Sequence, residues 1–418
     1  MTSPAAGTVR AGRDRGGVAY VGLAAGLSAA VGYAVTVLAA RLLGSVAETT
    51  RLLTFVSLVM VWYGVLAGVS LETTRAHASV ARTGASGGTR TWRVAAALMA
   101  GCLLAVVLAA PLWRRLLDAP SDALLALLAG GVAAYVGHAC LVGAVSGRRR
   151  WRLAAGVVAV EAATRALVLV AVCVVGVTVP GLALVTVAGA AGWVLVLVAS
   201  PTARAALAGR FDHGPLPVTG RVLSAMGAQA AGAALVVGFP ALLSATTSRH
   251  EYLTAAPLIL AVTLTRAPLL VPLNAFQGML VSTLTHRSGR LAVPALTLPA
   301  GLGALAVLLL GAWTVGPVLM VAVLGPSYDV SGAVLAALVV AAVLLAALSV
   351  SGAVCQTRDR PGAYLAGWLV ALAGTVAVLL APGGLTGRAV LALLVGPAAG
   401  VLVHVVAARR TAVDRAAT

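Results

Sequence analysis

Glu161 and Arg165 are the residues whose types and spacing first suggest chemistry, because they lie in the otherwise uncharged stretch VEAATRALVLV. Four residues apart on a helix, a carboxylate and a guanidinium share one face and can form an ion pair. At the centre of a membrane helix each charge costs about 2.5–3.5 kcal/mol. The pair therefore indicates either mutual neutralisation that joins helices or a polar site within a membrane.

Arg266 is a second arginine in an apolar run, LILAVTLTRAPLLVPL (258–273), which contains no acidic residue. Together with Arg165 and Glu161 it leaves an excess of positive charge in apolar segments. A buried cation without a partner is costly, so we expect water or an anionic ligand to meet it. This interpretation loses its basis if protein carboxylates or carbonyls occupy both arginines and seal them from water.

His138 and Arg75 are weaker candidates for contact with a ligand. In AAYVGHACLVG, the lone His138 is compatible with a hydrogen bond between helices or with a protonatable group. In SLETTRAH, Arg75 lies three residues after Glu72, and a salt bridge at the membrane interface is the favoured interpretation. We include both residues in the predicted substrate site.

Asn274 and Gln277 complete the predicted substrate site, because they follow Arg266 in the same apolar run. Pro268 and Pro272 are expected to bend this helix and to free backbone groups that need a protein-lined or watery interior. Glu161 is expected to hold Arg165 in position or to carry a coupling proton.

Composition shows where these residues must lie. Hydrophobic residues make up 61% of the 418 positions and charged residues 10%, far from soluble averages. All 29 cationic residues are arginine, which excludes lysine chemistry such as a P-loop or a Schiff base in this chain. The charges fall in short loops between apolar runs, which is typical of membrane topology and not of nucleic-acid binding. We expect that the protein is not an enzyme and that it has no catalytic residue, metal site or cofactor.

Apolar runs long enough to span a bilayer predict an all-α integral membrane protein with twelve transmembrane helices. Most arginines fall on one side of these helices, and the other side holds Arg41, Arg51, Arg114, Arg115, Arg249 and Arg388. The positive-inside rule then places both termini in the cytoplasm and the chain in the cytoplasmic membrane. The predicted helices are 18–40, 52–71, 94–112, 123–146, 153–178, 182–199, 222–244, 252–282, 291–315, 331–350, 364–380 and 389–407.

A weak internal repeat divides these helices into halves. VSLETTR (69–75) and VSTLTHR (281–287) each fall at the end of the second helix of a half. Two parallel halves with a substrate between them are a recurrent plan in transporters. We predict a six-helix lobe at 1–200, a cytoplasmic linker at 201–221, a second six-helix lobe at 222–408 and a cytoplasmic tail at 409–418.

Several short motifs occur in an order that resembles a known family: VLAARLLG (37–44), LETTRA (71–76), SGRRRW (146–151), EAATR (161–165), LTRAPL (264–269) and VLGPSYDVSG (323–332). They resemble the Wzx-type polysaccharide-transport branch of the multidrug/oligosaccharidyl-lipid/polysaccharide (MOP) exporter superfamily. The resemblance implies a MATE-like fold with two lobes and alternating access. It also implies a flippase for a polyprenyl-diphosphate-linked oligosaccharide, used in cell-surface or exopolysaccharide biosynthesis.

The residues agree with that implied substrate, because guanidinium binds phosphate oxygens through paired, charge-assisted hydrogen bonds. The expected partners are the lipid-linked oligosaccharide, membrane lipids, and polysaccharide polymerase or glycosyltransferases. Two alternatives stay open. One is a MATE-like antiporter of cationic drugs and protons, which would use Glu161; the other is a non-transporting membrane partner of a polysaccharide assembly system.

Overall fold

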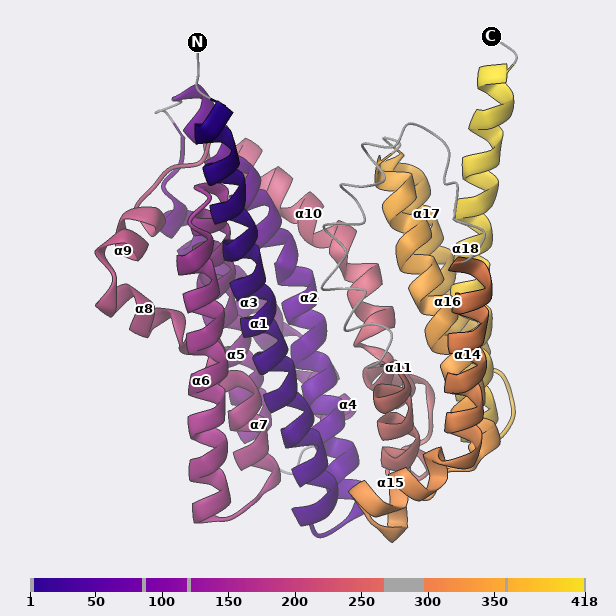
Figure 1. The fold of residues 1–418 in the computed structure, drawn as a ribbon. Helices are drawn as coiled ribbons and strands as arrows, with labels where there is room; N and C mark the ends of the chain where they lie inside the picture. The colour runs from indigo at the N-terminus through magenta and orange to yellow at the C-terminus, as the bar shows by residue number, and fades with distance from the viewer. Residues whose placement is uncertain (1–3, 85–87, 119–121, 267–296, 358–359, 417–418) are drawn as a thin grey trace. The chain divides into compact units, whose positions relative to one another are not determined.

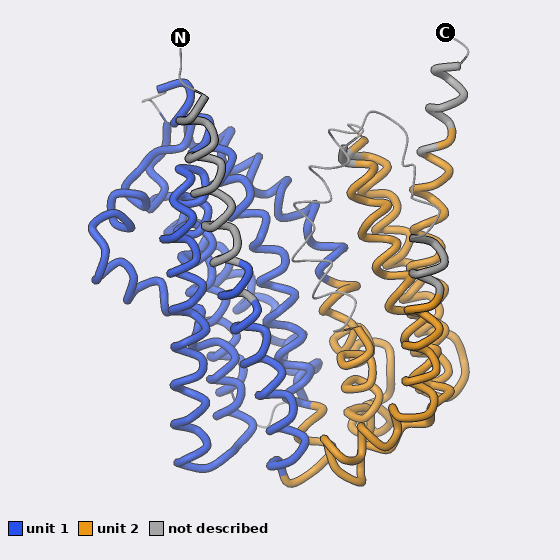
Figure 2. The backbone as a smooth tube through the Cα atoms, viewed as in Figure 1, with its two compact units in different colours: residues 1–43, 51–233 blue, residues 44–50, 234–418 orange. Residues whose placement is uncertain are grey.

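The computed structural model describes residues 4–84, 88–118, 122–266, 297–357 and 360–416. Across these ranges the chain is built from helices joined by short turns (Figure 1), so the predicted all-α class is confirmed. The chain forms two compact units (Figure 2), which are residues 1–43 with 51–233 and residues 44–50 with 234–418. This grouping places 201–233 with the first unit. The lobe boundaries expected from the sequence stay a prediction.

Unit 1 holds the helices of the N-terminal half. Two of them, α1 and α2, are much longer than the span of a bilayer needs, and α7 continues through the short 3₁₀ turn η1 into α8. The elements are α1 (Pro4–Leu42), α2 (Val46–Thr83), α3 (Thr91–Leu108), α4 (Ala110–Leu117), α5 (Ala123–Gly147), α6 (Trp151–Val175), α7 (Val179–Ala188), η1 (Gly189–Ala191), α8 (Trp193–Ala199), α9 (Pro201–Leu207) and α10 (Pro215–Val236).

Unit 2 begins within the last turn of α10 and contains the C-terminal helices, of which α16, α17 and α18 are long and continuous. Its elements are α11 (Phe239–Thr246), α12 (Arg249–Tyr252), an apolar helix at Ala256–Arg266, α14 (Thr297–Thr314), α15 (Gly316–Leu324), the 3₁₀ turn η2 (Pro326–Tyr328), α16 (Gly332–Thr357), α17 (Pro361–Leu379) and α18 (Leu385–Ala416).

The described residues contain nine helices long and apolar enough to cross a membrane, or up to eleven if two broken pairs each count as one span. One prediction is wrong in detail: 222–244 is not a continuous helix, because the chain breaks between Val236 and Phe239, where Gly238 precedes Pro240. The predicted helix 252–282 is described only as far as Arg266. Asn274, Gln277 and the predicted bend at Pro268 and Pro272 lie outside the described residues.

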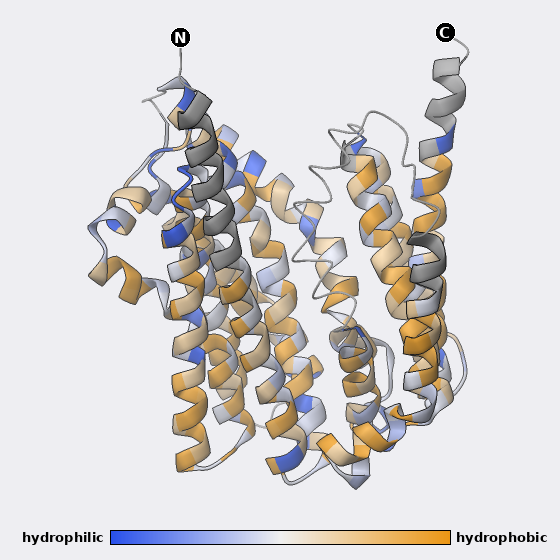
Figure 3. Ribbon diagram, viewed as in Figure 1, coloured by the Kyte–Doolittle hydropathy of each residue, from blue (hydrophilic) through white to orange (hydrophobic). Residues whose placement is uncertain are grey.

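Hydropathy along the helices explains why the chain adopts them. Hydrophobic residues cover most of each long helix, and hydrophilic residues gather toward helix ends and loops (Figure 3). Lipid offers no hydrogen-bond partner to the backbone, so a chain this apolar must satisfy its peptide groups within each segment, and a helix does this. Exposed large side chains on α3 and α6, such as Leu108 and Val175, are then surfaces for lipid.

Close helix packing in unit 1 depends on small residues. Helix α1 packs along α6, and α3 packs along α5. A Cβ at Gly143 would lie 2.7 Å from the Ser70 carbonyl oxygen, and one at Gly147 would lie 2.5 Å from the Thr74 carbonyl oxygen. Both positions therefore require glycine, and α5 lies directly on the backbone of α2.

Polar side chains inside unit 2 are satisfied by neighbouring helices. The Nδ1 atom of His404 on α18 is 2.8 Å from Ser351 Oγ on α16, and its Nε2 atom is 3.1 Å from the Tyr364 carbonyl oxygen on α17. His404 is 1% exposed, which makes it a hydrogen-bonded core residue of this three-helix group.

Candidate functional site

Glu161 and Arg165 form the predicted ion pair, and it lies inside unit 1. They project from the middle of α6, 7% and 6% exposed, and Arg165 Nη2 donates to Glu161 Oε1. Ser28 on α1 completes the contact, because its hydroxyl accepts from Arg165 Nη1 at 3.3 Å and donates to Glu161 Oε1 at 3.5 Å. The pair is thus neutral overall and joins α6 to α1.

Two glycines allow the α7–α8 segment to approach this pair. A Cβ at Gly189 would lie 2.7 Å from the Glu161 carbonyl oxygen and 3.4 Å from Arg165 Nε, and one at Gly192 would lie 3.3 Å from Glu161 Cα. The Nε atom of Arg165 is buried and has no hydrogen-bond partner within the described ranges. The packing therefore holds the guanidinium tightly and leaves one of its donors unused.

An aromatic column lies in the same unit. The rings of Tyr63 on α2 and Tyr135 on α5 stack with centroids 3.8 Å apart, and the Tyr135 and His138 rings stack at 5.2 Å. The described structure provides no hydrogen-bond partner for the buried His138 Nδ1 atom or the Tyr63 hydroxyl. Inside unit 1 the structure thus brings Glu161 and Arg165 together with Ser28, and His138 together with Tyr135 and Tyr63.

Sequence reasoning missed Ser28, which contacts the ion pair, and Tyr63, which stacks on Tyr135. Ser28 occurs in LAAGLSAAVGY, where a single hydroxyl among small residues is a weak signal. Tyr63 occurs in MVWYGVL, where its ring is typical of an ordinary membrane helix. Only the helix packing indicates which polar groups meet the ion pair.

Arg75 lies at the charged end of α2 and is fully engaged by carboxylates. It donates to Glu72 from Nε at 2.8 Å and from Nη2 at 2.6 Å, which confirms the predicted salt bridge. It also donates to both oxygens of Asp212, at 2.8 and 3.0 Å. Asp212 lies in the turn between α9 and α10, so this network ties α2 to that turn. All three nitrogen atoms of Arg75 already donate to carboxylates. Its predicted contact with a substrate stays a prediction.

This network keeps the carboxyl group of Asp212 ionised. Burial by itself would raise the pKa of its carboxyl, but hydrogen bonds from Arg75 and His213 and their charges lower the pKa far below its usual range. The side chain of Asp212 is 6% exposed and that of Arg75 is 40% exposed. Asp212 is therefore ionised at any physiological pH.

Arg266 lies in unit 2 and has a different environment. It is 9% exposed, and its Nη1 atom donates to the carbonyl oxygens of Val236 at 2.9 Å and Leu235 at 3.4 Å. Its guanidinium carbon is 5.9 Å from the centroid of the Phe239 ring. The sequence offers no acid to Arg266, and in the described structure backbone carbonyls and an aromatic ring contact it instead.

The partners of Arg266 come from the break between α10 and α11. A helix leaves its last four carbonyls without internal donors and carries a partial negative charge at that end. Leu235 and Val236 are in the last turn of α10, and Gly238 and Pro240 stop the chain from continuing as one helix. Gly238 and Pro240, two residues apart, could have indicated this break in the sequence, because glycine and proline commonly interrupt helices. The cation thus sits on a helix end instead of a carboxylate.

The two arginines of the predicted headgroup site consequently differ in charge balance. Arg165 is neutralised by Glu161, whereas none of the ion pairs among the described residues includes Arg266. The basis for a transport site is lost if protein groups occupy both arginines and also seal them from water. The first part of this condition is met, since protein groups contact both guanidiniums. Their roles in substrate binding and that of Glu161 in coupling stay predictions. The described residues also contain no group of three or more His, Cys, Asp or Glu that could hold a metal ion.

Comparison with solved structures defines the class of fold. The chain superimposes on an inward-facing multidrug resistance MATE family transporter of the MOP superfamily with a TM-score of 0.64, covering 94% of both chains at 14% identity. It also matches a MATE in the straight conformation with a TM-score of 0.65, covering 96% of this chain and 95% of that chain at 14% identity. The fold is that of the MATE transporters, and the protein is a multi-pass membrane protein.

Sequence comparison defines the family. The chain is 39% identical over 403 residues to protein Rv1510 of Mycobacterium tuberculosis strain H37Rv, covering 95% of this chain and 92% of the relative. It is 38% identical over 404 residues to protein Rv3630 of the same strain, covering 95% and 93%. The chain belongs to the family of these mycobacterial proteins. A scan against protein-family models finds no match.

Proposed function

We propose that the protein moves an anionic, lipid-linked oligosaccharide across the cytoplasmic membrane by alternating access, as a flippase for cell-surface or exopolysaccharide biosynthesis. The observation that supports this most is the position of Arg266 at the end of the broken helix α10. In transporters, discontinuous helices at membrane depth place backbone charge at substrate and ion sites. A cation added to such an end makes an anion the complementary ligand.

Arg266 retains the capacity to bind a diphosphate. A guanidinium has five N–H donors, and both carbonyl contacts of Arg266 use Nη1. Its Nε and Nη2 atoms make no hydrogen bond to another residue of the described ranges. These two nitrogens form the edge that pairs side by side with two phosphate oxygens.

A cation/proton antiporter is the second candidate, and it is favoured by the multidrug MATE transporters among the structural neighbours. Such a protein needs a carboxylate that is available to a cation or a proton. Glu161 already accepts from Arg165 and Ser28, and its charge is balanced by the guanidinium. A carboxylate so occupied offers little attraction to a further cation, so the anion-carrying function is the better supported one.

The experiment is depletion of the protein in cells, followed by complementation with variants produced at equal levels. We expect depletion to accumulate sugar-loaded lipid in the cytoplasmic leaflet. This lipid is measured as the fraction that a membrane-impermeant glycan probe does not reach in intact cells. Arg266→Ala should reproduce the defect, while the matched control Arg82→Ala, which removes an exposed arginine of α2, should complement fully.

Other outcomes separate the alternatives. Normal surface polysaccharide with Arg266→Ala overturns the site. Loss of resistance to cationic dyes with Glu161→Gln, but not with Arg266→Ala, supports the antiporter instead. Lipid-linked intermediates that are made and flipped normally without the protein indicate a non-transporting partner.

A further inference from the structure

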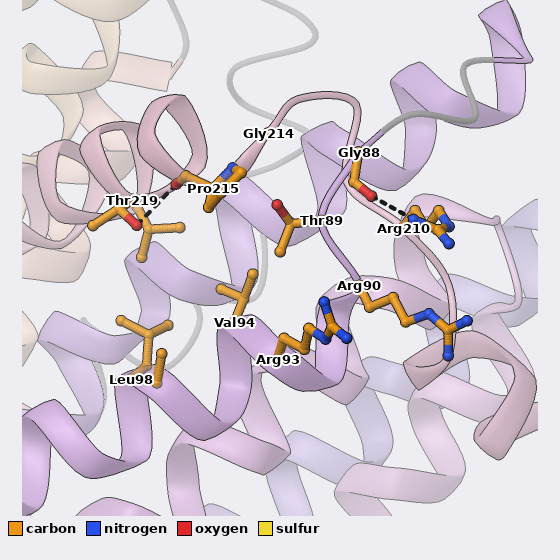
Figure 4. Close-up of a pocket in the computed structure, with 12 residues that line it drawn as sticks. Gly88, Thr89, Arg90, Arg93, Val94, Leu98, Arg210, Gly214, Pro215 and Thr219 are labelled. Atoms are coloured by element: carbon orange, nitrogen blue, oxygen red, sulfur yellow. Dashed lines mark hydrogen bonds between the residues drawn. The ribbon is translucent and has the colours of Figure 1, made fainter.

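A pocket of about 730 Å³ lies in unit 1 where α3 begins, separate from the buried ion pair. Arg90, Arg93 and Arg210 line one side of it, and Val94 and Leu98 line the other (Figure 4). The lining residues include no carboxylate. The pocket therefore combines a strongly cationic part with an apolar part.

The backbone forces two of these arginines together. Arg90 and Arg210 face each other in an isolated antiparallel bridge. The flanking hydrogen bonds run from Phe211 N to the Thr89 oxygen at 2.8 Å and from Thr91 N to the Gly209 oxygen at 2.9 Å. In this arrangement the opposed side chains leave the same face with Cβ atoms about 4.5–5.5 Å apart.

Like charges directly opposite each other destabilise such a pair unless something compensates for them. The side chains of Arg90 and Arg93 make no ion pair or hydrogen bond with another described residue, and Arg93 only lies over the ring of Trp92 at 5.4 Å. Arg210 donates to the Gly88 carbonyl oxygen at 3.0 Å, which fixes its guanidinium at the edge of the pocket. Three exposed arginines thus line one pocket without an acidic partner in the described structure, and an anion is the complementary ligand.

The backbone on which Arg90 and Arg210 lie is held at several points. Thr89 N donates to the His213 carbonyl oxygen at 3.0 Å, and a Cβ at Gly88 would collide with the Phe211 carbonyl oxygen. Glycine at 88 is therefore required for the loop before α3 to lie against the loop before α10. The backbone therefore needs no rearrangement to present these side chains to an anion.

The apolar side of the pocket indicates what bears the anionic group. Val94 and Leu98 lie one and two turns into α3, a helix that can span a membrane and whose far end exposes Leu104 and Leu108 to its surroundings. A ligand whose charged end lies among the arginines would direct an apolar tail along this helix. Basic pockets beside membrane helices bind anionic lipid headgroups in this way.

We propose that this pocket binds the headgroup of a lipid that carries a phosphomonoester or a diphosphate. The arginines hold the phosphate oxygens through charge-assisted hydrogen bonds, and Val94 and Leu98 contact the first carbons of the tail. The site goes beyond the proposed transport function, because it is separate from Arg165 and Arg266 and binds whether or not the protein moves an oligosaccharide.

The test is a binding measurement on the purified full chain in detergent, by microscale thermophoresis, with three probes: dioctanoyl phosphatidic acid, dioctanoyl phosphatidylcholine and inorganic pyrophosphate. We expect phosphatidic acid to bind at least about tenfold more tightly than either other probe. Arg90→Gln combined with Arg93→Gln should weaken phosphatidic acid binding by about tenfold or more, since charge-assisted hydrogen bonds are lost. These side chains support no described hydrogen bond, so the melting temperature should hold.

The matched control is Arg82→Gln combined with Arg115→Gln, which removes the same charge at positions that do not line the pocket. An equal loss of affinity in this control overturns the proposal in favour of general attraction by a basic protein. Pyrophosphate that binds as tightly as phosphatidic acid overturns the lipid as ligand, and phosphatidylcholine that does so overturns the recognition of phosphate charge. A second variant, Leu98→Asn, should weaken phosphatidic acid alone; equal weakening of pyrophosphate contradicts the assigned tail contact.

Discussion

The two buried arginines of this chain are stabilised in opposite ways. Arg165 in unit 1 donates to the Glu161 carboxylate, also on α6, and to the Ser28 hydroxyl on α1. Arg266 in unit 2 donates to two carbonyl oxygens at the end of α10 and lies over the ring of Phe239. The first arrangement is neutral and joins helices. The second satisfies donors but leaves the charge in place, since a helix end offers only about half an elementary charge. A buried arginine is therefore a functional signal only after its counter-charge has been identified.

The largest effect is expected from removing the counter-charge of Arg165. Glu161→Gln leaves a buried guanidinium without a carboxylate, and breaking a buried pair in this way costs about 3–5 kcal/mol. We expect a strongly lowered melting temperature of the detergent-purified protein. Arg165→Met in the same chain should restore most of it, because both charges are then gone. A single variant as stable as the unmodified protein would show that Glu161 does not neutralise Arg165.

A smaller loss is expected from crowding the same pair. In Gly189→Ala, the new methyl group would lie 2.7 Å from the Glu161 carbonyl oxygen, and overpacking of this kind costs about 1–3 kcal/mol. Gly156→Ala is the matched control, because it lies on α6 itself and its methyl group would meet nothing within 4 Å. We expect thermal unfolding to separate the two variants. Equal melting temperatures would mean that the α7–α8 segment does not confine the ion pair.

The Phe239 ring provides a test of the second arrangement. Phe239→Leu removes the aromatic face 5.9 Å from the Arg266 guanidinium, which is worth about 0.5–2 kcal/mol beyond the packing. Phe55→Leu is the control, since Phe55 is also fully buried and has no cation among its described contacts. The excess loss of stability for Phe239→Leu over Phe55→Leu measures the cation–π contribution. No excess would leave the helix end as the sole support of the charge.

The smallest effect concerns Asp212, which lies in the turn before α10 and accepts from Arg75 of α2. The pKa of Asp212 is lower in the folded protein than in the unfolded chain, so its contribution to stability is fully present above the unfolded value of about 4. That contribution is lost as pH falls toward the folded value. We expect the melting temperature of the unmodified protein to fall more between pH 6 and pH 3 than that of Asp212→Asn. Parallel declines would place the pH dependence elsewhere.

Part of the site was predictable because it is local. Glu161 and Arg165 are one helical turn apart, and Glu72 and Arg75 are three residues apart, so the helical repeat alone predicts both salt bridges. The carbonyl partners of Arg266 lie 30 and 31 residues away in the sequence, and Asp212 lies 137 residues from Arg75. No periodicity connects positions so far apart.

The amino-acid sequence alone predicted the membrane class, the helical structure and most of the described spans, because lipid leaves an apolar chain no other way to satisfy its backbone. It also indicated that Glu161, Arg165 and Arg266 are buried. Only the tertiary structure decided which of them are balanced: it brought Ser28 to the Glu161–Arg165 pair and the end of α10 to Arg266, and it placed Arg90 opposite Arg210. The reason is physical, since the cost of a buried charge depends on the groups within a few ångströms of it, and the folded chain alone selects those groups.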